Sequence, residues 1–143
     1  WRFAMNQEAM NRRKLLIKDL MTLRRFVPVF QFQTLNEQLK GPEKEFFAEV
    51  VVDLANTFRG MPAIGGNHDN YGESAIVHLH YFSPAGDWWI TERDPGHTQS
   101  QVFGLADLGF REFGYIPLVE LLRQPLVEVD FHWKKLAVGE ILK

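Results

Sequence analysis

The spacing of the apolar residues changes once along this chain, and that change most constrains its fold. Between residues 43 and 60 large apolar side chains recur every three or four positions, which is the period of an α-helix. From Val127 to Trp133 apolar and polar residues alternate one by one, which is the period of a strand with one buried face. A helical first half and a stranded second half predict the α+β class, with an antiparallel sheet packed on one face by the N-terminal helices.

The first 60 residues contain the signals that begin and end helices. Pro28 disfavours helix in the residue before it, so it ends the first helical segment. The run Thr34–Glu37 is a capping-box pattern that begins a short second helix. Gly60 closes the third and best-supported helix. We therefore predict helices over residues 6–25, 34–40 and 43–60.

The second half contains turn signals between short apolar runs. Ser83–Gly86 separates two of these runs and predicts a hairpin. Glu112–Tyr115 contains a glycine beside aromatic residues, which is typical of a tight corner. We expect a sheet of about four strands, over residues 75–83, 87–93, 101–106 and 127–133, a loop over 61–74, a short helix over 117–123 and a helical turn over 134–142.

Length and composition limit the class of protein. A chain of 143 residues with 45% hydrophobic side chains predicts a single domain over residues 1–143, mainly helical over 1–60 and sheet over 75–133. With no cysteine, disulfide scaffolds, thiolate nucleophiles and Cys-ligated metal sites are excluded, and a reducing, cytoplasmic setting is expected. We expect no membrane span and no secretion signal. Because the chain starts with Trp1 rather than Met, we interpret residues 1–4 either as foreign to the natural sequence or as the edge of a fragment.

Four short stretches of the second half carry a recognisable order. A tryptophan-rich strand ends in Thr-Glu with a nearby Asp (residues 87–94), and a Phe-Gly strand follows (103–105). A Glu-Phe-Gly-Tyr run (112–115) then leads into a Leu-rich helix (116–122). This order resembles a bacterial, plasmid and phage family known as domain of unknown function 2958, over about residues 75–133. The resemblance implies a mobile-element setting, beside DNA-handling and antirestriction functions, and no particular activity.

The tryptophan strand supplies one candidate binding surface. Trp88 and Trp89 point to opposite faces of a strand, so we expect at most one in the core and the other exposed, where it anchors a partner or stacks on a base. Glu92 and Asp94 alternate onto one face, where paired carboxylates can share acid–base work. The alternative for this pair is turn chemistry before Pro95.

The first helix supplies a second candidate surface. Residues 1–60 hold ten Lys and Arg against seven Asp and Glu, whereas residues 61–143 hold six against eleven. A basic helix beside an acidic body can face phosphates or an acidic protein surface. The alternative is an ordinary solvated helix face. The candidate contacts are Arg12, Arg13 and Lys18.

The histidines suggest a divalent metal site. His78 and His80 share one face of a predicted strand, and Asp130 and His132, with Glu128, share a face of another. If these faces meet, imidazoles and carboxylates cluster as metal ligands do. The alternative is half-buried histidine beside a solvated acidic edge.

Gly66–Asp69 reads Gly-Asn-His-Asp, a signature of metallophosphoesterases. That two-metal centre also needs an upstream Asp-x-His, a Gly-Asp pair and a late Gly-His-x-His. The upstream residues are absent, and His78-Leu79-His80 lacks the preceding glycine. We therefore interpret this run as part of a flexible loop.

Two classes of function follow from these patterns. The first is a non-enzymatic accessory or interaction module of a plasmid or phage, with a host defence protein as its partner, or nucleic acid bound through the basic helix. The second is a small metal-dependent enzyme acting on nucleic acid or nucleotide. Because no complete catalytic constellation is present, the sequence favours the first. It predicts no particular cofactor and no oligomeric state.

Overall fold

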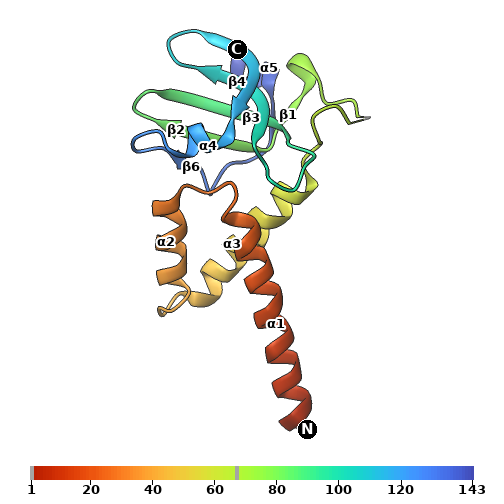
Figure 1. Cartoon of the computed structure of the whole chain (residues 1–143), viewed down its shortest axis with the longest axis vertical. Coiled ribbons are helices and arrows are strands. Elements are labelled where there is room, and N and C mark those ends of the chain that lie inside the picture. The colour runs from red at the N-terminus through yellow and green to blue at the C-terminus, as the bar shows by residue number, and fades with distance from the viewer. Residues whose placement is uncertain (1, 67) are drawn as a thin grey trace.

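A computed structural model describes residues 2–66 and 68–143 of the chain (Figure 1). Trp1, in the segment that we interpreted as foreign or as the edge of a fragment, and Asn67, in the Gly-Asn-His-Asp run, lie outside the described residues. The elements in chain order are α1 (Arg2–Leu23), α2 (Val29–Gln38), α3 (Lys44–Gly60), the 3-10 turn η1 (Gly72–Ser74), β1 (Ile76–Val77), β2 (Leu79–Ser83), β3 (Gly86–Arg93), β4 (Gln101–Asp107), β5 (Arg111–Pro117), α4 (Leu118–Leu122), β6 (Glu128–Val129), β7 (Leu136–Ala137) and α5 (Val138–Leu142).

The five-stranded sheet has the order β5-β4-β3-β2-β6, and every neighbouring pair is antiparallel. A separate antiparallel pair joins β1 to β7. The three long helices lie on one side of this sheet, and α1 extends away from it toward the N-terminus (Figure 1). The prediction of an α+β protein with an antiparallel sheet against N-terminal helices is confirmed.

Both faces of the sheet are covered by apolar contacts. On the helix side, Trp88 and Ile90 of β3 share a large core with α3, whose Val51, Leu54, Ala55 and Phe58 are buried. Phe58 also stacks on Phe26 with ring centroids 4.2 Å apart. On the opposite side, a smaller core consists of Ala75, Val77, Trp89, Leu105 and Val138. In a sheet with one solvated face, every second side chain along a strand is exposed to solvent. Here both faces are covered, so side chains on both faces are buried.

A buried tyrosine links the sheet to the end of the first helix. The Tyr81 hydroxyl of β2 donates a hydrogen bond to the Phe26 carbonyl, 55 residues earlier in the chain. Burial raises the pKa of Tyr81, so the phenol stays protonated and remains a donor. This bond satisfies a carbonyl that the turn after α1 leaves without a helical partner.

The helix predictions hold, with shifted boundaries. The first helix ends at Leu23, ahead of Pro28 as expected. The second begins at Val29 rather than Thr34, because Pro28 precedes the first turn; the Thr34 hydroxyl instead donates back to the Phe30 carbonyl within the helix. None of the helices in the described part of the chain is long and apolar enough to cross a membrane.

Two strand predictions are wrong. The Glu112–Tyr115 segment is no corner; it lies within the seven-residue strand β5, and Gly114 pairs with Gly104 of β4. The strand expected over 127–133 has only the residues Glu128 and Val129 in its ladder. It ends because the Asp130 carboxylate accepts a hydrogen bond from the backbone N–H of His132, which bends the chain. The expected turn over 134–142 contains β7 and α5.

Candidate functional site

An irregularity in β3 brings three side chains of the sheet into one row. The pairing of β3 with β4 shifts register between Ile90 and Glu92, so Thr91 is the extra residue of a β-bulge. Beyond the bulge Glu92 pairs with Phe103, and Phe103 pairs with Tyr115. Directly paired residues project to the same face, so these three side chains lie side by side across β3, β4 and β5.

The bulge also changes the face on which Glu92 lies. In an uninterrupted strand Glu92 would share a face with Trp88 and Ile90, toward the helices. The inserted Thr91 turns it to the face of Trp89 instead. Glu92 therefore points into the region beneath the loop between α3 and β1.

That loop is tied to the sheet by its backbone and by one amide side chain. The Ile64 N–H donates to the Arg93 carbonyl at 2.8 Å, and the Arg93 N–H donates to the Pro62 carbonyl at 2.9 Å. The Asn70 side chain donates to the Thr91 carbonyl at 2.9 Å and accepts from the Ile76 N–H at 2.7 Å. These bonds hold the described part of the loop over the bulge.

His68 of this loop is held in place by hydrogen bonds at both of its ring nitrogens. Its Nδ1 accepts a hydrogen bond from the Asn70 N–H at 3.1 Å, so Nδ1 carries no proton. Its Nε2 therefore carries the proton and donates to the Ala63 carbonyl at 3.1 Å. Nε2 also lies 3.7 Å from the nearer Glu92 carboxylate oxygen, which is too far for a hydrogen bond.

The Glu92 carboxylate is consequently a buried acid with no hydrogen-bond donor among the described residues. Glu92 is 8% exposed. Burial raises its pKa, and a positive charge on the neighbouring His68 would oppose that rise. Its few exposed atoms face a cavity of about 310 Å³, which we call the Glu92 pocket. Its walls are Ile64, Gly65, Gly66, His68, Asn70, Tyr71, Gly72, Ala75, Thr91, Phe103, Phe113 and Tyr115.

Sequence reasoning selected Glu92 for this site and missed its neighbours. Phe103, Phe113 and Tyr115 belong to the stretches that carry the family resemblance, and His68 belongs to the run that we interpreted as a loop. An antiparallel alignment of the Trp-rich and Phe-Gly strands could have placed Phe103 near Glu92. The bulge that sets the face of Glu92 leaves no comparable signal.

The expectation of an exposed tryptophan is wrong. Trp88 is 5% exposed and Trp89 is 9% exposed, although they point to opposite faces. Trp88 packs in the core on the helix side, and Trp89 packs beneath β1 and α5. The second apolar layer was not visible in the sequence, and it removes both rings from any binding surface.

Asp94 lies outside the pocket that Glu92 lines, and its carboxylate is bound within its own loop. Asp94 accepts hydrogen bonds from the N–H groups of Gly96 and Ser100, at 2.8 and 2.9 Å, and from the Ser100 hydroxyl. These bonds, the one from Gly96 foremost, lower the pKa of Asp94 and fix the loop before β4. Asp94 therefore has the turn-forming role that we gave as the alternative, whereas Glu92 lines the Glu92 pocket.

The proposed metal ligands do not form a single cluster. Across residues 2–66 and 68–143, no group of three His, Asp or Glu side chains is arranged to hold a metal ion. The His80 Nε2–H donates to the Asp87 carboxylate at 2.8 Å, while Nδ1 lies 4.0 Å from the Asp130 carboxylate. The His80 ring also stacks on Trp89, with centroids 5.6 Å apart.

The two remaining histidine candidates have different surroundings. Burial, with a smaller effect of Lys135, lowers the pKa of His78 to about 4, so this imidazole is neutral at physiological pH. His132 is exposed, and its backbone rather than its ring bonds Asp130. The predicted strand that would have aligned Asp130 and His132 stops at Val129. These two residues and His78 line one hollow of about 320 Å³ without forming a metal-ligand cluster among the described residues.

The basic helix presents two different faces. Arg12 and Arg13 border a hollow of about 540 Å³ between α1 and α3, together with Glu49 and Asp53. Lys18 lies on the opposite side, since Leu16, Leu20 and Leu23 make the apolar contacts with the rest of the protein. We call that opposite side the outward face of α1; it consists of Met10, Lys14, Ile17, Lys18 and Met21, all of them exposed.

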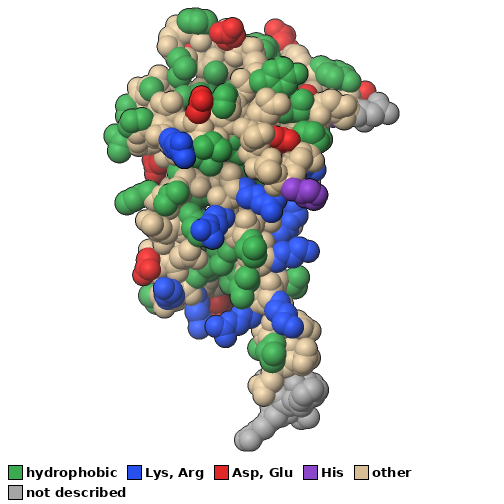
Figure 2. All heavy atoms as spheres, viewed as in Figure 1, with side chains coloured by type: hydrophobic (Ala, Val, Ile, Leu, Met, Phe, Trp, Pro, Cys, Tyr) green, Lys and Arg blue, Asp and Glu red, His purple; other side chains and the backbone are tan. Residues whose placement is uncertain are grey.

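Large apolar side chains are unusually open on this outward face. Met10, Ile17 and Met21 are 53%, 50% and 64% exposed. They lie away from the side of α1 that packs on the protein, and α1 itself extends past the body of the protein (Figure 1). On the side shown in Figure 2, Lys and Arg side chains gather over the helical half. The only acid in the second half of α1, Asp19, is paired with Arg59 of α3.

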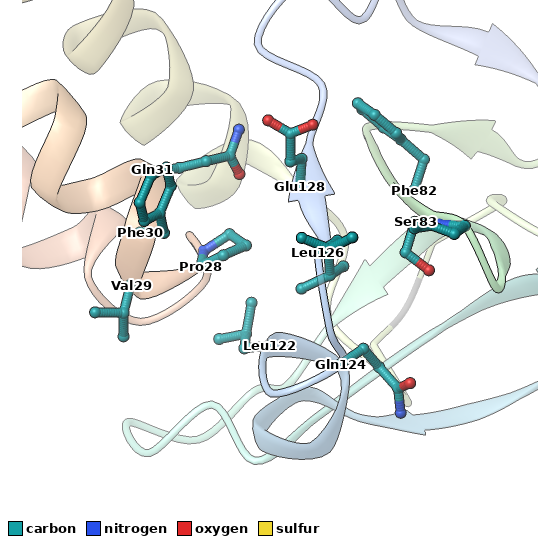
Figure 3. Close-up of a pocket in the computed structure, with 12 residues that line it drawn as sticks. Pro28, Val29, Phe30, Gln31, Phe82, Ser83, Leu122, Gln124, Leu126 and Glu128 are labelled. Carbon is teal, nitrogen blue, oxygen red and sulfur yellow. The ribbon is translucent and has the colours of Figure 1, made fainter.

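An apolar groove of about 880 Å³ forms a hollow beside the start of α2. Figure 3 shows side chains from the start of α2 across this hollow from Phe82 of β2, with Leu126 between them. Phe30 and Leu126 are largely exposed there. The groove contains no charged side chain other than Glu128, so its chemistry is that of an apolar surface.

Comparison with known proteins identifies the family. The family model described as "Protein of unknown function (DUF2958)" matches residues 53–134, more than half of the chain. The chain belongs to this family. The matched residues include every wall of the Glu92 pocket, while α1 and α2 precede them. No curated protein and no solved structure matches the chain.

Proposed function

We propose that the protein is a non-enzymatic interaction module that binds an acidic surface of a partner protein through the outward face of α1. The observation that carries this proposal is the combination of large exposed apolar side chains with lysines on one side of a single helix. Contiguous exposed apolar residues bordered by charge are characteristic of protein-binding surfaces.

The chemistry of this face favours a helical or flat acidic partner. Met and Ile side chains fill apolar pockets of a partner and exclude water around them. Lys14 and Lys18 add positive charge at the rim, which accelerates association with an acidic surface and rejects a basic one. An acidic protein offers both contacts, whereas the phosphates of nucleic acid would use the lysines alone.

We extend the proposal to a setting in the cytoplasm of a bacterium that carries a plasmid or phage. Membership of the family supports this extension, because the resemblance implies a mobile-element origin. The partner would then be a host defence protein.

The alternative is a small metal-dependent enzyme acting on nucleic acid or nucleotide. The observation that favours an enzyme is the Glu92 pocket, in which a carboxyl with a raised pKa lies beside the His68 imidazole, whereas no metal-ligand cluster among the described residues supports the metal. Glu92→Gln separates the two functions. The interaction module keeps its partner in this variant, whereas an enzyme that uses the Glu92 carboxylate loses turnover.

The experiment is affinity capture from nuclease-treated bacterial lysate, read by mass spectrometry, with variants of the outward face. We expect Lys14→Glu with Lys18→Glu, and separately Ile17→Ser with Met21→Ser, to reduce the captured protein at least about tenfold. Capture by the wild type should also weaken as salt rises.

The matched control is Phe110→Ser with Arg123→Glu, which changes one exposed apolar and one exposed basic residue outside α1. This control should capture as much partner as the wild type does. Equal capture by the control and by both outward-face variants would contradict the proposal. Loss of all captured protein on nuclease treatment would favour nucleic acid as the partner.

A further inference from the structure

The Glu92 pocket contains an unmatched negative charge, and this makes it a binding site in its own right. The Glu92 side chain is 11% exposed, and its carboxylate accepts no hydrogen bond from the described residues. Buried carboxylates are ordinarily paired with a cation or with several donors. A group from outside the chain can supply the missing partner.

The walls of the pocket specify the charge of that group. Glu92 is the only acidic side chain among the lining residues, and His68 is the only basic one. Protonation of His68 at Nδ1, which a countercharge to Glu92 would need, breaks the hydrogen bond from the Asn70 N–H, so an external cation competes with His68 for this role. An anion would be repelled by Glu92, and a neutral apolar ligand would leave the carboxylate desolvated and unpaired.

The aromatic side chains around Glu92 favour an organic cation over a metal ion. Phe103 and Tyr115 meet edge to face, with centroids 5.3 Å apart, and Tyr71 lies against His68 on the loop side. Aromatic faces attract ammonium and guanidinium groups. A metal ion would need further oxygen or nitrogen ligands, and the described walls offer one carboxylate and an imidazole whose two nitrogens are already engaged.

We propose that the Glu92 pocket binds an organic ammonium or guanidinium group, which pairs with the Glu92 carboxylate and packs against the rings of Phe103 and Tyr115. A cavity of about 310 Å³ accepts such a head group with a short carbon chain. The group can belong to a free amine or to a basic side chain of a peptide, since the two share this head group.

Titration of Glu92 supports this assignment. Because burial raises the pKa of Glu92, part of the free protein carries a neutral carboxyl at mildly acidic pH. A bound cation favours the ionised form and releases that proton. Affinity for the cation therefore rises with pH through the raised pKa and then levels off.

The experiment is an NMR titration of the intact protein with n-butylammonium chloride, with L-lysine amide and L-arginine amide, and with a short lysine-containing peptide. We expect saturable shifts of the backbone resonances of Gly65, Gly66 and Glu92. Tighter binding of the peptide than of the free amides would assign the site to a basic side chain, and the reverse would assign it to a free amine. n-Butanol, which lacks the charge, should give no saturable shift.

Three variants separate pocket binding from general effects. Glu92→Gln should weaken n-butylammonium binding about tenfold or more, because it removes a charge-assisted bond. Tyr115→Leu should weaken it about threefold, because it removes a ring face. Glu112→Gln, an exposed carboxylate on the opposite face of β5, should bind as the wild type does.

Equal binding by wild type and Glu92→Gln, or saturable binding of n-butanol, would overturn the proposal. So would the absence of saturation by all the cations at millimolar concentration. The result is independent of the function proposed for α1, because the outward-face variants should bind n-butylammonium unchanged while Glu92→Gln retains its protein partner.

Discussion

At the scale of single residues, Glu92 shows how one position acquires an unusual environment. A glutamate near the end of a strand is ordinarily solvated, but the bulge at Thr91 turns this side chain beneath a loop. Its carboxylate is held there by packing rather than by donors. An unpaired buried acid lowers stability, so its presence is consistent with a binding role.

The stability of the Glu92→Gln variant tests this environment. The folded protein favours the neutral carboxyl, because the pKa of Glu92 is raised above its ordinary value of 4.5. Ionised Glu92 therefore costs stability at neutral pH, and this cost disappears as pH falls through the raised pKa. Glutamine keeps the shape and removes the charge. We expect the variant to melt a few degrees above wild type at pH 7, with the difference vanishing below about pH 4.

Thermal melting followed by circular dichroism across this pH range checks the prediction. A melting temperature equal to or below that of wild type at pH 7 would show that Glu92 is stabilised by a partner that the present contacts do not include. A difference that stays constant with pH would show that the effect does not come from the carboxylate charge.

Residue environments were the hardest property to predict from the sequence. The prediction that Trp88 and Trp89 point to opposite faces of β3 was correct. Both side chains are nevertheless buried, because a second apolar layer covers the other face of the sheet. Asp94 was paired with Glu92 by counting residues, but its carboxylate is bound by Gly96 and Ser100 and does not line the Glu92 pocket. Alternation describes a regular strand, and neither the bulge nor the second layer alters the local sequence pattern that was analysed.

At the scale of elements, the glycines of β4 and β5 explain how the bulged strand is accommodated. A side chain at Gly104 would collide with the Trp89 carbonyl of β3, so the two strands can approach only with glycine at this position. Gly114 is its direct partner on β5, but a side chain there would meet no heavy atom within 4 Å. Two paired glycines therefore have different roles.

This difference is directly testable in a matched pair of variants. We expect Gly104→Ala to destabilise the protein by about 1–3 kcal/mol, because β3 or β4 must move to admit the methyl group. Gly114→Ala should leave stability unchanged or slightly raised, because alanine restricts the unfolded chain. Urea unfolding of both variants measures the two effects. Similar losses in both would contradict a close approach that is confined to Gly104.

Elements with strong periodicity were predicted well, and short ones were not. The apolar spacing of α3 and the turn signals between β2 and β3 are local, so the sequence was sufficient for them. β5 was mistaken for a corner because Gly114 interrupts its pattern and its side chains are largely exposed. Its place in the sheet is set by pairing with β4, a contact that the local pattern does not reveal.

At the scale of the whole molecule, the two proposals occupy different parts of the fold. The Glu92 pocket lies within the residues matched by the family model, and α1 lies before them. The unequal distribution of charge was evident in the sequence, and the Lys and Arg side chains over the helical half follow it (Figure 2). The sequence did not reveal that α1 extends past the rest of the protein, because this depends on how much of α1 packs against α3.

The exposed face of α1 is the basis of the central claim, and site-specific photo-crosslinking in cells tests it most directly. A photo-crosslinking amino acid replaces Ile17 on the outward face in one sample and exposed Phe110, at the turn before β5, in another. We predict one discrete protein adduct from position 17, resistant to nuclease and lost with Lys14→Glu and Lys18→Glu, and no such adduct from position 110. Adducts to nucleic acid from position 17, or a discrete protein adduct from position 110 alone, would contradict the account.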